Sequence, residues 1–299
     1  MLRFLGVALC LSPVLPLVLG LTGGLHPIGD SFAVFRWHFA VLTGLGALIL
    51  FTMNWKWLKG VAAVWFGVAI FFGTGVLWAG LEHRVSEEAK YSLYQKNLSF
   101  RLADKQAVVS DILQHNPDFV TFQEVNEANT EVLSALAGQY QSQLTCGFLW
   151  VGGVSVASRW PMVEGSERCI ERLGAVAIQV TTADGPLWLV SVHLHWPYPH
   201  TQARQIERLQ PFLNGLEGRV VVGGDFNMVP WSYAMHSLQD LTETERAGAV
   251  SYTYSLFNGF LELPIDHVLV PATEGQQTRT QLRPLLGSDH MGILARFKL

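Results

Sequence analysis

Val220–Asn227, with the sequence VVVGGDFN, gives the clearest indication of the fold. Three β-branched apolar residues in a row predict a short strand that is buried on both faces. Gly223 and Gly224 follow and allow the backbone to turn closely, because glycine lacks a Cβ. Asp225 and Asn227 then project to one side at a spacing of two. The stretch therefore predicts a buried strand with polar groups just beyond its end; a turn rich in Asp and Asn side chains is the alternative interpretation.

Five further segments share this arrangement, in which polar side chains lie at or just beyond the end of an apolar, strand-like run. They are YQKNLSF with Asn97, FVTFQEV with Gln123 and Glu124, LVSVHLHW with His193, PIDHVLV with Asp266 and His267, and GSDHMG with Ser288, Asp289 and His290. Together they supply carboxylates, amides and imidazoles, the groups needed to hold a divalent metal and to cleave a phosphate ester. A turn or a solvated loop explains each motif alone, but not six together.

The histidine motif also alternates between apolar and polar residues. Its apolar residues fall on one face of the predicted strand, which we expect to be core, and Ser191, His193 and His195 fall on the other face. This second face is either exposed to solvent or the floor of a site. We interpret His195 as a flanking residue that shapes the choice of substrate.

Predicted strands and helices interleave from residue 92 to the C-terminus. We expect strands at Ser92–Asn97, Asp118–Gln123, Val151–Ser158, Ala175–Thr181, Leu187–Leu194, Arg219–Val222, Ile265–Val270 and Ile293–Phe297. Helical spacing of apolar residues predicts helices at Asp104–His115, Asn129–Leu136 and Gln202–Leu213. This order, with several successive strands in the middle, predicts an α/β sandwich of two packed sheets with outer helices.

Charged residues are distributed unevenly along the 299-residue chain. The first 81 residues hold only four of the 20 basic and one of the 24 acidic side chains, so the remainder carries a formal charge of −7. This charge argues against a broad basic track for long nucleic acid, which would have to neutralise many phosphates. It does not exclude a nuclease, because a bound metal offsets local acidic groups.

Three uncharged apolar stretches in the first 81 residues predict a transmembrane region (1–81) of two to three helices, followed by a linker (82–91) and a catalytic domain (92–299). A spanning helix needs about 20 apolar residues, so we expect Trp37–Trp55 and Gly60–Leu81 to span. Phe4–Gly29, which contains two prolines, is either a third span or an uncleaved signal-like segment. Core helices of a soluble domain are the alternative, but so few charges leave no polar face for water.

The orientation follows from the distribution of basic residues. With the N-terminus inside, Arg3, Lys56 and Lys59 lie inside, whereas Arg36 and Arg84 lie outside. This bias favours an odd number of crossings. We therefore expect a multi-pass protein of the cell (inner) membrane whose catalytic domain lies outside the cytoplasm, in the periplasm if the source is Gram-negative.

Two cysteines, Cys146 and Cys169, lie in the predicted catalytic domain. In an oxidising compartment they can form a disulfide. Two small buried thiols are the alternative, and the sequence leaves both open.

The types and order of the six motifs resemble those of the endonuclease/exonuclease/phosphatase superfamily, the DNase I-like metal-dependent phosphoesterases, from about Tyr91 to the C-terminus. The resemblance is to a bacterial, membrane-anchored member. It implies the two-sheet α/β sandwich and a Mg²⁺ cofactor, with Mn²⁺ as a substitute. It also implies that Glu124 binds the metal, that Asn97 steadies the metal site, and that Asp289 is a second ligand or a site carboxylate.

The same resemblance implies roles for the other candidate residues. Asp225 positions or deprotonates the attacking water, Asn227 donates to the phosphate, and His193 contacts the phosphate. We expect Asp266 to pair with His290, because a carboxylate bonded to an imidazole fixes its tautomer and raises its basicity.

We therefore expect a membrane-tethered, metal-dependent hydrolase that cleaves phosphodiesters, or phosphomonoesters, by in-line attack of an activated water. Its substrate is either nucleic acid or a phospholipid or small phosphodiester. The tether, the net acidity and the Trp196-Pro197-Tyr198-Pro199 loop favour lipid, although such a loop can also stack a base. A non-catalytic, membrane-anchored binding protein with the same fold is the alternative, but every expected catalytic position is present. The sequence indicates no protein partner.

Overall fold

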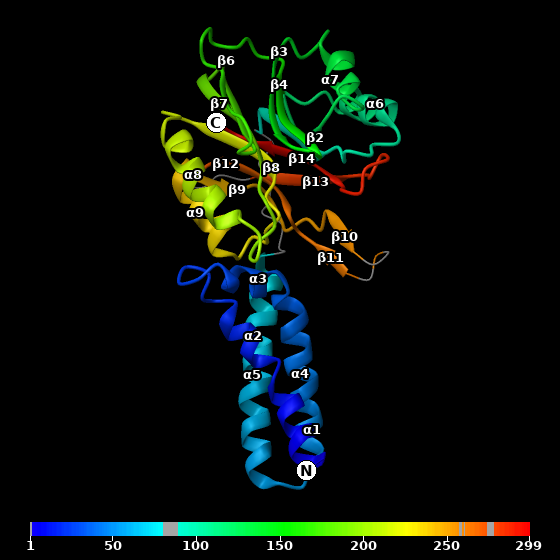
Figure 1. The fold of residues 1–299 in the computed structure, drawn as a ribbon, viewed down its shortest axis with the longest axis vertical. Coiled ribbons are helices and arrows are strands. Elements are labelled where there is room, and N and C mark those ends of the chain that lie inside the picture. Colours follow the sequence, from blue (N-terminus) through cyan, green and yellow to red (C-terminus); the bar gives the residue numbers. More distant parts are fainter. Residues whose placement is uncertain (1, 80–88, 257–258, 260, 274–277) are drawn as a thin grey trace.

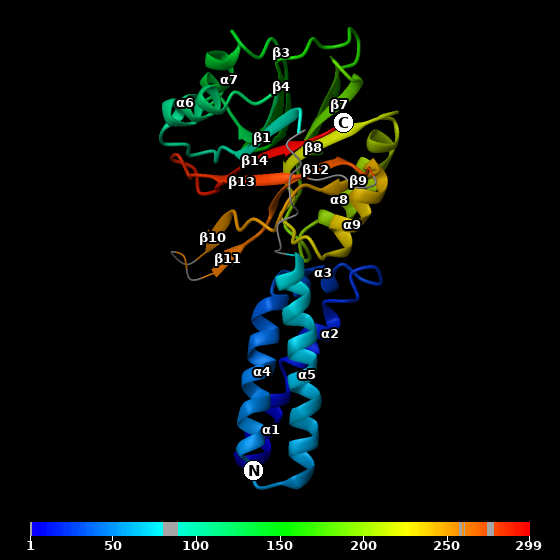
Figure 2. The same ribbon diagram turned by 180° about the vertical axis from the view of Figure 1, so that it is seen from behind.

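Two six-stranded β-sheets pack face to face in the C-terminal domain (Figure 1 and Figure 2). The computed structural model describes residues 2–79, 89–256, 259, 261–273 and 278–299. In spatial order, the first sheet contains β13 (Arg279–Arg283), β14 (Gly292–Phe297), β1 (Tyr91–Asn97), β2 (Phe119–Val125), β4 (Gly152–Ser158) and β3 (Ser142–Leu149). The second contains β5 (Arg168–Ile170), β6 (Ala175–Thr182), β7 (Gly185–His193), β8 (Val220–Asp225), β12 (Asp266–Pro271) and β9 (Thr244–Arg246). β10 (Tyr254–Leu256) and β11 (Leu261–Leu263) form a separate hairpin.

Helices cover the outer face of each sheet, as predicted for an α/β sandwich. The first sheet buries apolar side chains against α6 (Lys105–His115) and α7 (Glu131–Leu136). The second sheet buries them against α8 (Gln202–Asn214) and α9 (Tyr233–Thr242). A third apolar layer, which includes Leu93, Phe119 and Val221, fills the space between the sheets. Because the sheets are covered on both faces, every residue of β8 is buried.

Four strands bring the polar motifs to one edge of the sandwich. β1 and β2 run parallel in the first sheet, and β7 and β8 run parallel in the second. Their carboxyl ends carry Asn97, Glu124, His193 and Asp225. β12 runs antiparallel to β8 and begins with Asp266, whose Cα lies opposite that of Asp225. Polar residues that are far apart in the sequence therefore meet at this edge.

Gly223 and Gly224 lie inside β8. The prediction that they let the backbone turn after the strand is therefore wrong. A Cβ on Gly223 would stand 2.1 Å from Oγ1 of Thr121 in the facing sheet. A Cβ on Gly224 would stand 2.4 Å from the carbonyl oxygen of Val192 in the neighbouring strand. Glycine is required here because the backbones and side chains pack so closely.

The polar face of β7 is buried between the sheets, so the solvent-exposed interpretation of this face is wrong. Ser191 is fully buried, and its hydroxyl accepts a hydrogen bond from Nε2 of Gln123 at 3.0 Å. His193 is also buried at the end of the strand. β7 ends there, so His195 lies beyond the alternating pattern.

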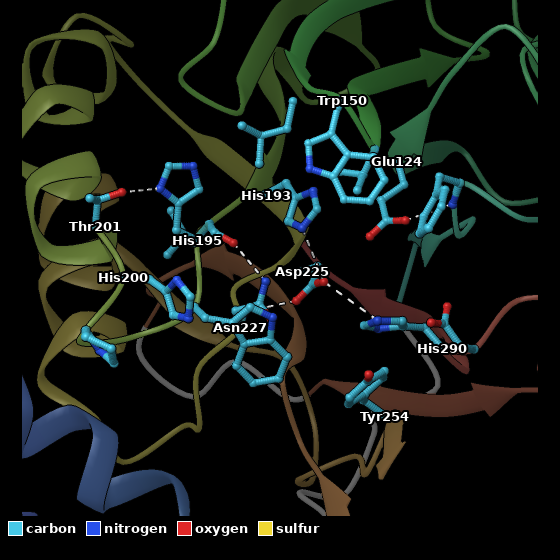
Figure 3. A pocket seen from close by; sticks show the side chains of 17 residues that line it. Glu124, Trp150, His193, His195, His200, Thr201, Asp225, Asn227, Tyr254 and His290 are labelled. Carbon is cyan, nitrogen blue, oxygen red and sulfur yellow. Dashed lines mark hydrogen bonds and ion pairs between the residues drawn. The ribbon is translucent and has the colours of Figure 1, made fainter.

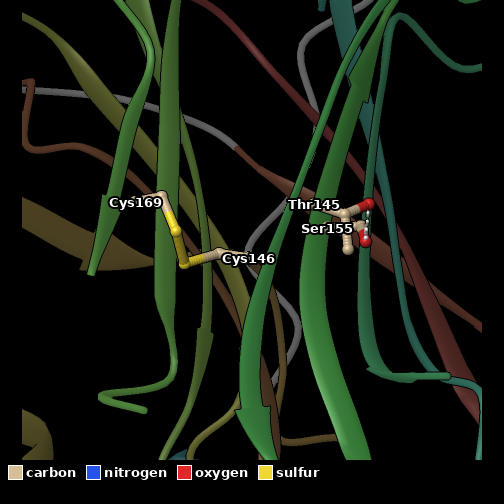
Figure 4. The surroundings of a disulfide bond; sticks show 4 residues. All are labelled: Thr145, Cys146, Ser155 and Cys169. Carbon is tan, nitrogen blue, oxygen red and sulfur yellow. Dashed lines mark hydrogen bonds between the residues drawn. A yellow bond between two sulfur atoms is a disulfide. The ribbon is translucent and has the colours of Figure 1, made fainter. Parts of the chain in front are cut away.

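Cys146 in β3 and Cys169 in β5 form a disulfide that joins the edges of the two sheets (Figure 4). The structure thereby decides between the two alternatives that the sequence left open. The cysteines are 23 residues apart in the sequence. Closing a loop of that size removes conformational entropy from the unfolded chain equivalent to roughly 3 kcal/mol.

The N-terminal helices form a stalk beneath the C-terminal domain (Figure 1). They are α1 (Leu2–Leu11), α2 (Val14–Leu19), α3 (Ile28–Val34), α4 (Arg36–Thr52) and α5 (Lys56–Ala79). Of the described helices, α5 alone is long and apolar enough to cross a membrane, over Lys56–Leu77. α3 and α4, bent by 70° at the break between them, meet the same criterion only as a pair.

The first apolar stretch, Phe4–Gly29, does not form one helix. It breaks between α1 and α2, where Pro13 follows Ser12, and the helical structure ends near Gly20. Residues 82–88 of the predicted linker lie outside the described residues, and β1 begins at Tyr91.

Gly223→Ala should destabilise the C-terminal domain, because the added methyl group collides with Thr121. Overpacking of this kind costs roughly 1–3 kcal/mol, so we expect Tm of the detergent-solubilised protein to fall by several degrees. Thr121→Ala in the same chain should restore part of the loss. Gly147→Ala is the matched control, because a Cβ there meets nothing within 4 Å. Equal Tm values for the Gly223 and Gly147 variants would contradict this packing argument.

Candidate active site

The predicted polar residues converge on a cleft of about 710 Å³ at the carboxyl ends of the parallel strands (Figure 3). Six of the eight candidates line it, namely Glu124, His193, Asp225, Asn227, Asp289 and His290. The other two, Asn97 and Asp266, are fully buried and contact the lining residues from beneath. The structure thus brings all eight candidates together.

Glu124 enters the cleft through an irregularity in β2. The register of β2 against β4 shifts between Gln123 and Val125, and Glu124 has a φ of 58°. This bulge turns the carboxylate out of the normal alternation of the strand. Oε1 of Glu124 accepts a hydrogen bond from Nδ2 of Asn97 at 3.2 Å, and Oε2 accepts one from the backbone N–H of Phe100 at 2.8 Å. Burial raises the pKa of Glu124, and these two donors oppose the rise.

Asp225 occupies the centre of the site. Its Oδ2 accepts a hydrogen bond from Nδ2 of Asn97 at 3.0 Å, so Asn97 donates to both Asp225 and Glu124. Its Oδ1 accepts one from the backbone N–H of Asn227 at 2.9 Å. Nε2 of His193 lies 3.6 Å from Oδ2 of Asp225, and Nε2 of His290 lies 3.8 Å from the same atom. Two imidazoles therefore flank one carboxylate oxygen.

Asp266 and His290 form a buried pair. Nδ1 of His290 lies 2.8 Å from Oδ2 of Asp266, and Oδ1 of Asp266 accepts a hydrogen bond from Nε2 of Gln95 at 2.8 Å. Burial lowers the pKa of His290, but the negative charges of Asp266 and Asp225 outweigh it and raise the pKa to about 9. Burial, together with the charge of Asp266, raises the pKa of Asp225 to about 7. The pair therefore stabilises an imidazolium beside Asp225.

His193 differs from His290 in its electrostatic surroundings. Burial lowers the pKa of His193 to about 3, so its imidazole is neutral near pH 7. Its ring contacts Phe148 edge-on at 5.3 Å. Phe148 also stacks on His195 at 5.2 Å, and Nδ1 of His195 lies 2.6 Å from Oγ1 of Thr201. His195 lines the cleft beside the polar floor.

Sequence reasoning missed the polar groups that support the site from within β1. Gln95 donates to Oε1 of Gln123 at 2.9 Å as well as to Asp266. Lys96 is fully buried, and its Nζ donates to the backbone carbonyl oxygens of His290 at 2.9 Å and Pro284 at 3.2 Å. The available signal was two consecutive polar residues inside an otherwise buried strand.

Aromatic side chains form the walls of the cleft, and sequence reasoning singled out the Trp196 loop but not Phe100 or Trp150. Trp150, in the turn between β3 and β4, is 81% exposed and packs edge-on against Phe100 at 5.1 Å. Trp196 and Tyr254 also line the cleft, with ring centroids 6.1 Å apart. A ligand with a flat or cationic group can contact such walls while its phosphate lies on the polar floor.

Two sets of side chains offer oxygen or nitrogen atoms to a metal ion. Ligand atoms of Asp225, Asp266 and His290 lie within 4.8 Å of one another, but Asp266 already bonds His290 and is fully buried. Glu124 and Asp289 present carboxylates to the cleft, and the charge of Asp289 adds to the burial-driven rise in the pKa of Glu124. Oxygen ligands in a wet cleft suit a hard cation such as Mg²⁺, so the second set fits better.

Comparison with known proteins identifies related folds. Residues 95–290 match the Endonuclease/Exonuclease/phosphatase family, a range that includes all eight candidate residues. No curated protein sequence matches the chain significantly. Among solved structures, a double mutant of the beta toxin from Staphylococcus aureus with bound magnesium ions is 13% identical with a TM-score of 0.55, covering 70% of this chain and 99% of that one.

Two other solved structures share the fold. The D. rerio TDP2 complexed with single strand DNA product is 19% identical with a TM-score of 0.54. Sphingomyelinase C from Streptomyces griseocarneus is 16% identical with a TM-score of 0.52. Each covers 70% of this chain and 99% of its own. At these identities the similarity concerns the fold alone.

Asp266→Asn should lower the pKa of the His290 imidazole in the metal-free protein from about 9 towards its ordinary value. The reason is that removing the negative charge destabilises the imidazolium. NMR titration of the histidine Cε1–H signals measures this pKa, with His290→Gln to identify the signal. Asp240→Asn, an exposed change on α9, is the control and should leave the pKa unchanged. An unchanged pKa in the Asp266 variant would show that the pair is not electrostatically coupled.

Proposed function

The chain belongs to the Endonuclease/Exonuclease/phosphatase family, and we propose that it is a membrane-tethered, Mg²⁺-dependent phosphoesterase. The observation that carries the proposal is the arrangement around Asp225. This buried carboxylate is bonded to Asn97, which also bonds Glu124, and it is flanked by His193 and by His290. A proton acceptor, an acidic metal site and donors for phosphate oxygens therefore surround one point in the cleft.

In the proposed reaction, the oxygen of a water molecule attacks phosphorus and the bond from phosphorus to the leaving alcohol oxygen breaks. Asp225 orients the water and takes its proton, which it later releases to solvent, while the leaving oxygen takes a proton from solvent. Asn227, His193 and His290 contact the phosphoryl oxygens. Asp266 holds His290 in a fixed orientation through the 2.8 Å hydrogen bond. Fixed donors that match the developing charge stabilise the transition state more than the substrate.

Glu124 and Asp289 would hold Mg²⁺, or Mn²⁺ in its place, and Asn97 would steady Glu124. When bound, the cation neutralises charge on the phosphoryl oxygens and favours attack by water. The magnesium ions in the S. aureus beta toxin structure support this choice of metal.

The substrate class is a phosphate ester of either nucleic acid or lipid. Support comes from two proteins of the same fold, the TDP2 bound to a DNA product and the sphingomyelinase C. Both kinds of substrate contain a phosphate ester that can place its phosphorus over Asp225. The formal charge of −7 on residues 82–299 disfavours extended contacts with a polyanion.

Asp225→Ala and His290→Ala should each lower the rate of bis(p-nitrophenyl) phosphate hydrolysis by at least about a hundredfold, because each removes a group from the reacting centre. The assay uses the full-length protein in detergent with Mg²⁺, and EDTA should abolish the activity. Glu124→Gln should raise the Mg²⁺ concentration needed for half-maximal rate, because a neutral amide binds the cation less tightly.

Glu164→Gln is the matched control, because Glu164 is exposed and does not line the cleft. Its rate and Mg²⁺ requirement should equal those of the unmodified protein. Full activity of either the Asp225 or the His290 variant would refute the proposed site. Wild-type protein that binds Mg²⁺ but hydrolyses no phosphate ester would favour a non-catalytic binding protein.

We also propose that the stalk crosses the cell membrane an odd number of times, with the C-terminal domain outside the cytoplasm. The length and apolarity of α5 support a span. Arg3, Lys56 and Lys59 favour a cytoplasmic location for that end of the stalk. The Cys146–Cys169 disulfide supports an oxidising compartment for the domain.

Reporter fusions in a Gram-negative host test this orientation. Alkaline phosphatase fused after Leu299 should be active, because it folds only outside the cytoplasm. Green fluorescent protein inserted between α4 and α5, after Asn54, should fluoresce, because it folds inside. If green fluorescent protein fused after Leu299 fluoresced instead, the domain would face the cytoplasm and the proposed orientation would be wrong.

A further inference from the structure

The segment that runs from the end of α2 to the first residue of α4 packs against the C-terminal domain. We call this segment, residues 20–36, the juxtamembrane segment. Its Ala33 and Val34 are buried in the same apolar cluster that joins the second sheet to α8 and α9. The stalk is therefore joined to the domain through a shared core as well as through the chain that follows α5.

Asp30 of this segment stabilises the start of α9. Its Oδ1 accepts a hydrogen bond from the backbone N–H of Tyr233 at 2.8 Å, and its Oδ2 accepts one from that of Ala234 at 3.0 Å. Ser232 supplies the usual cap by accepting from the N–H of Met235 at 3.1 Å. A carboxylate that lies 203 residues before Tyr233 in the sequence thus satisfies the remaining donors of the first turn, where the helix dipole favours negative charge.

Trp231, just before α9, makes the second attachment. Its Nε1 donates to the carbonyl oxygen of Ala33 at 2.8 Å, and its own carbonyl oxygen accepts from the guanidinium of Arg36 at 3.4 Å. The same guanidinium lies 5.9 Å from the centre of the indole ring. Trp231 lies on the same β8–α9 connection as Asn227, four residues further along, and Asn227 lines the cleft.

A third attachment reaches the loop between β7 and α8. Oγ of Ser31 donates to the carbonyl oxygen of Tyr198 at 2.7 Å, and the ring of His26 contacts the Tyr198 ring edge-on at 5.5 Å. The neighbours of Tyr198 on this loop, Trp196 and Pro199, line the cleft. The juxtamembrane segment therefore contacts two of the loops that form the cleft.

Residues at the two ends of α4 are of the kinds that favour a membrane surface. Arg36 and Trp37 begin the helix, whereas Trp55 and Lys56 follow its other end. Tryptophan and basic residues prefer the two interfaces of a bilayer. The 17 residues of α4 span about 25 Å, close to the thickness of the hydrocarbon core. Arg36, and with it Trp231, would thus lie among the lipid headgroups.

We propose that the cleft hydrolyses the headgroup phosphodiester of glycerophospholipids in the bilayer in which the protein is anchored, and that Asp30 holds the cleft at that surface. This inference rests on the proposed phosphoesterase function. Water adds across one P–O bond of the lipid, and the products are a phosphate monoester and an alcohol. The acidic domain and the attachment of two cleft-forming loops to the juxtamembrane segment favour a lipid over a polynucleotide.

The test uses full-length protein in nanodiscs of phosphatidylcholine and phosphatidylglycerol with Mg²⁺, and phosphorus NMR measures the loss of phosphodiester. The soluble counterparts are glycerophosphocholine and glycerophosphoglycerol at the same concentration. We expect the bilayer lipids to be hydrolysed at least about tenfold faster, because the anchor raises their effective concentration at the cleft. Asp30→Ala should lower the lipid rate about tenfold and leave the rate on bis(p-nitrophenyl) phosphate within about twofold.

Ser232→Ala is the matched control, because it removes a cap from the same helix and leaves the three attachments intact. It should preserve the ratio of lipid to soluble rates. Equal losses on both substrates in the Asp30 variant would show a merely structural role and overturn the positioning argument. The lipid assignment alone would be overturned if the protein cleaved plasmid DNA faster than lipid. It would also be overturned if the protein hydrolysed bis(p-nitrophenyl) phosphate in an Asp225-dependent way but left the lipid intact. If the wild-type protein did not hydrolyse bis(p-nitrophenyl) phosphate at all, the phosphoesterase proposal itself would be refuted.

Discussion

The burial of two carboxylates, Asp225 and Asp266, is the strongest demand that the site makes on the surrounding fold. They lie opposite each other on β8 and β12 and are almost wholly buried. Burying charge in this way is strongly unfavourable unless donors replace the lost water. Here Asn97 donates to Asp225, while Gln95 donates to Asp266, which also pairs with His290. The donors come from β1 and from the segment before β14, so the site is complete only when both sheets are packed together.

The approach of the two sheets depends on a few small side chains and on polar groups that satisfy one another. Gly223 leaves room for Thr121, and Gln123 bridges the interface to Ser191. Hydrogen bonds from Gln95 to Gln123 and from Gln123 to Ser191 favour one register, because a shift would leave these buried donors and acceptors unpaired. The same packing directs the parallel strand ends, and therefore the functional side chains, to a single edge.

The attachment of the domain to its stalk has consequences for the site as well as for stability. Asp30 accepts a hydrogen bond from the first turn of α9. Trp231, on the connection that also carries Asn227, donates one to the carbonyl oxygen of Ala33 in the juxtamembrane segment. Elsewhere in the domain, the Cys146–Cys169 disulfide joins β3 and β5, the adjacent edge strands of the two sheets. The domain thus has a covalent link between its sheets and a hydrogen-bonded link to the stalk.

The α/β sandwich and the eight polar candidates could be predicted from the sequence alone, because periodicity and the ends of apolar runs are local properties. Sequence reasoning misjudged Gly223, and it missed α9 and the aromatic wall at Trp150, because their contacts are not local. Asp30 accepts from two further N–H groups of the first turn of α9 beside the local cap Ser232, and the neighbour of Gly223 is Thr121 in another sheet. Such partners emerge only in the folded protein, because which buried groups satisfy one another depends on segments that meet after the chain has folded.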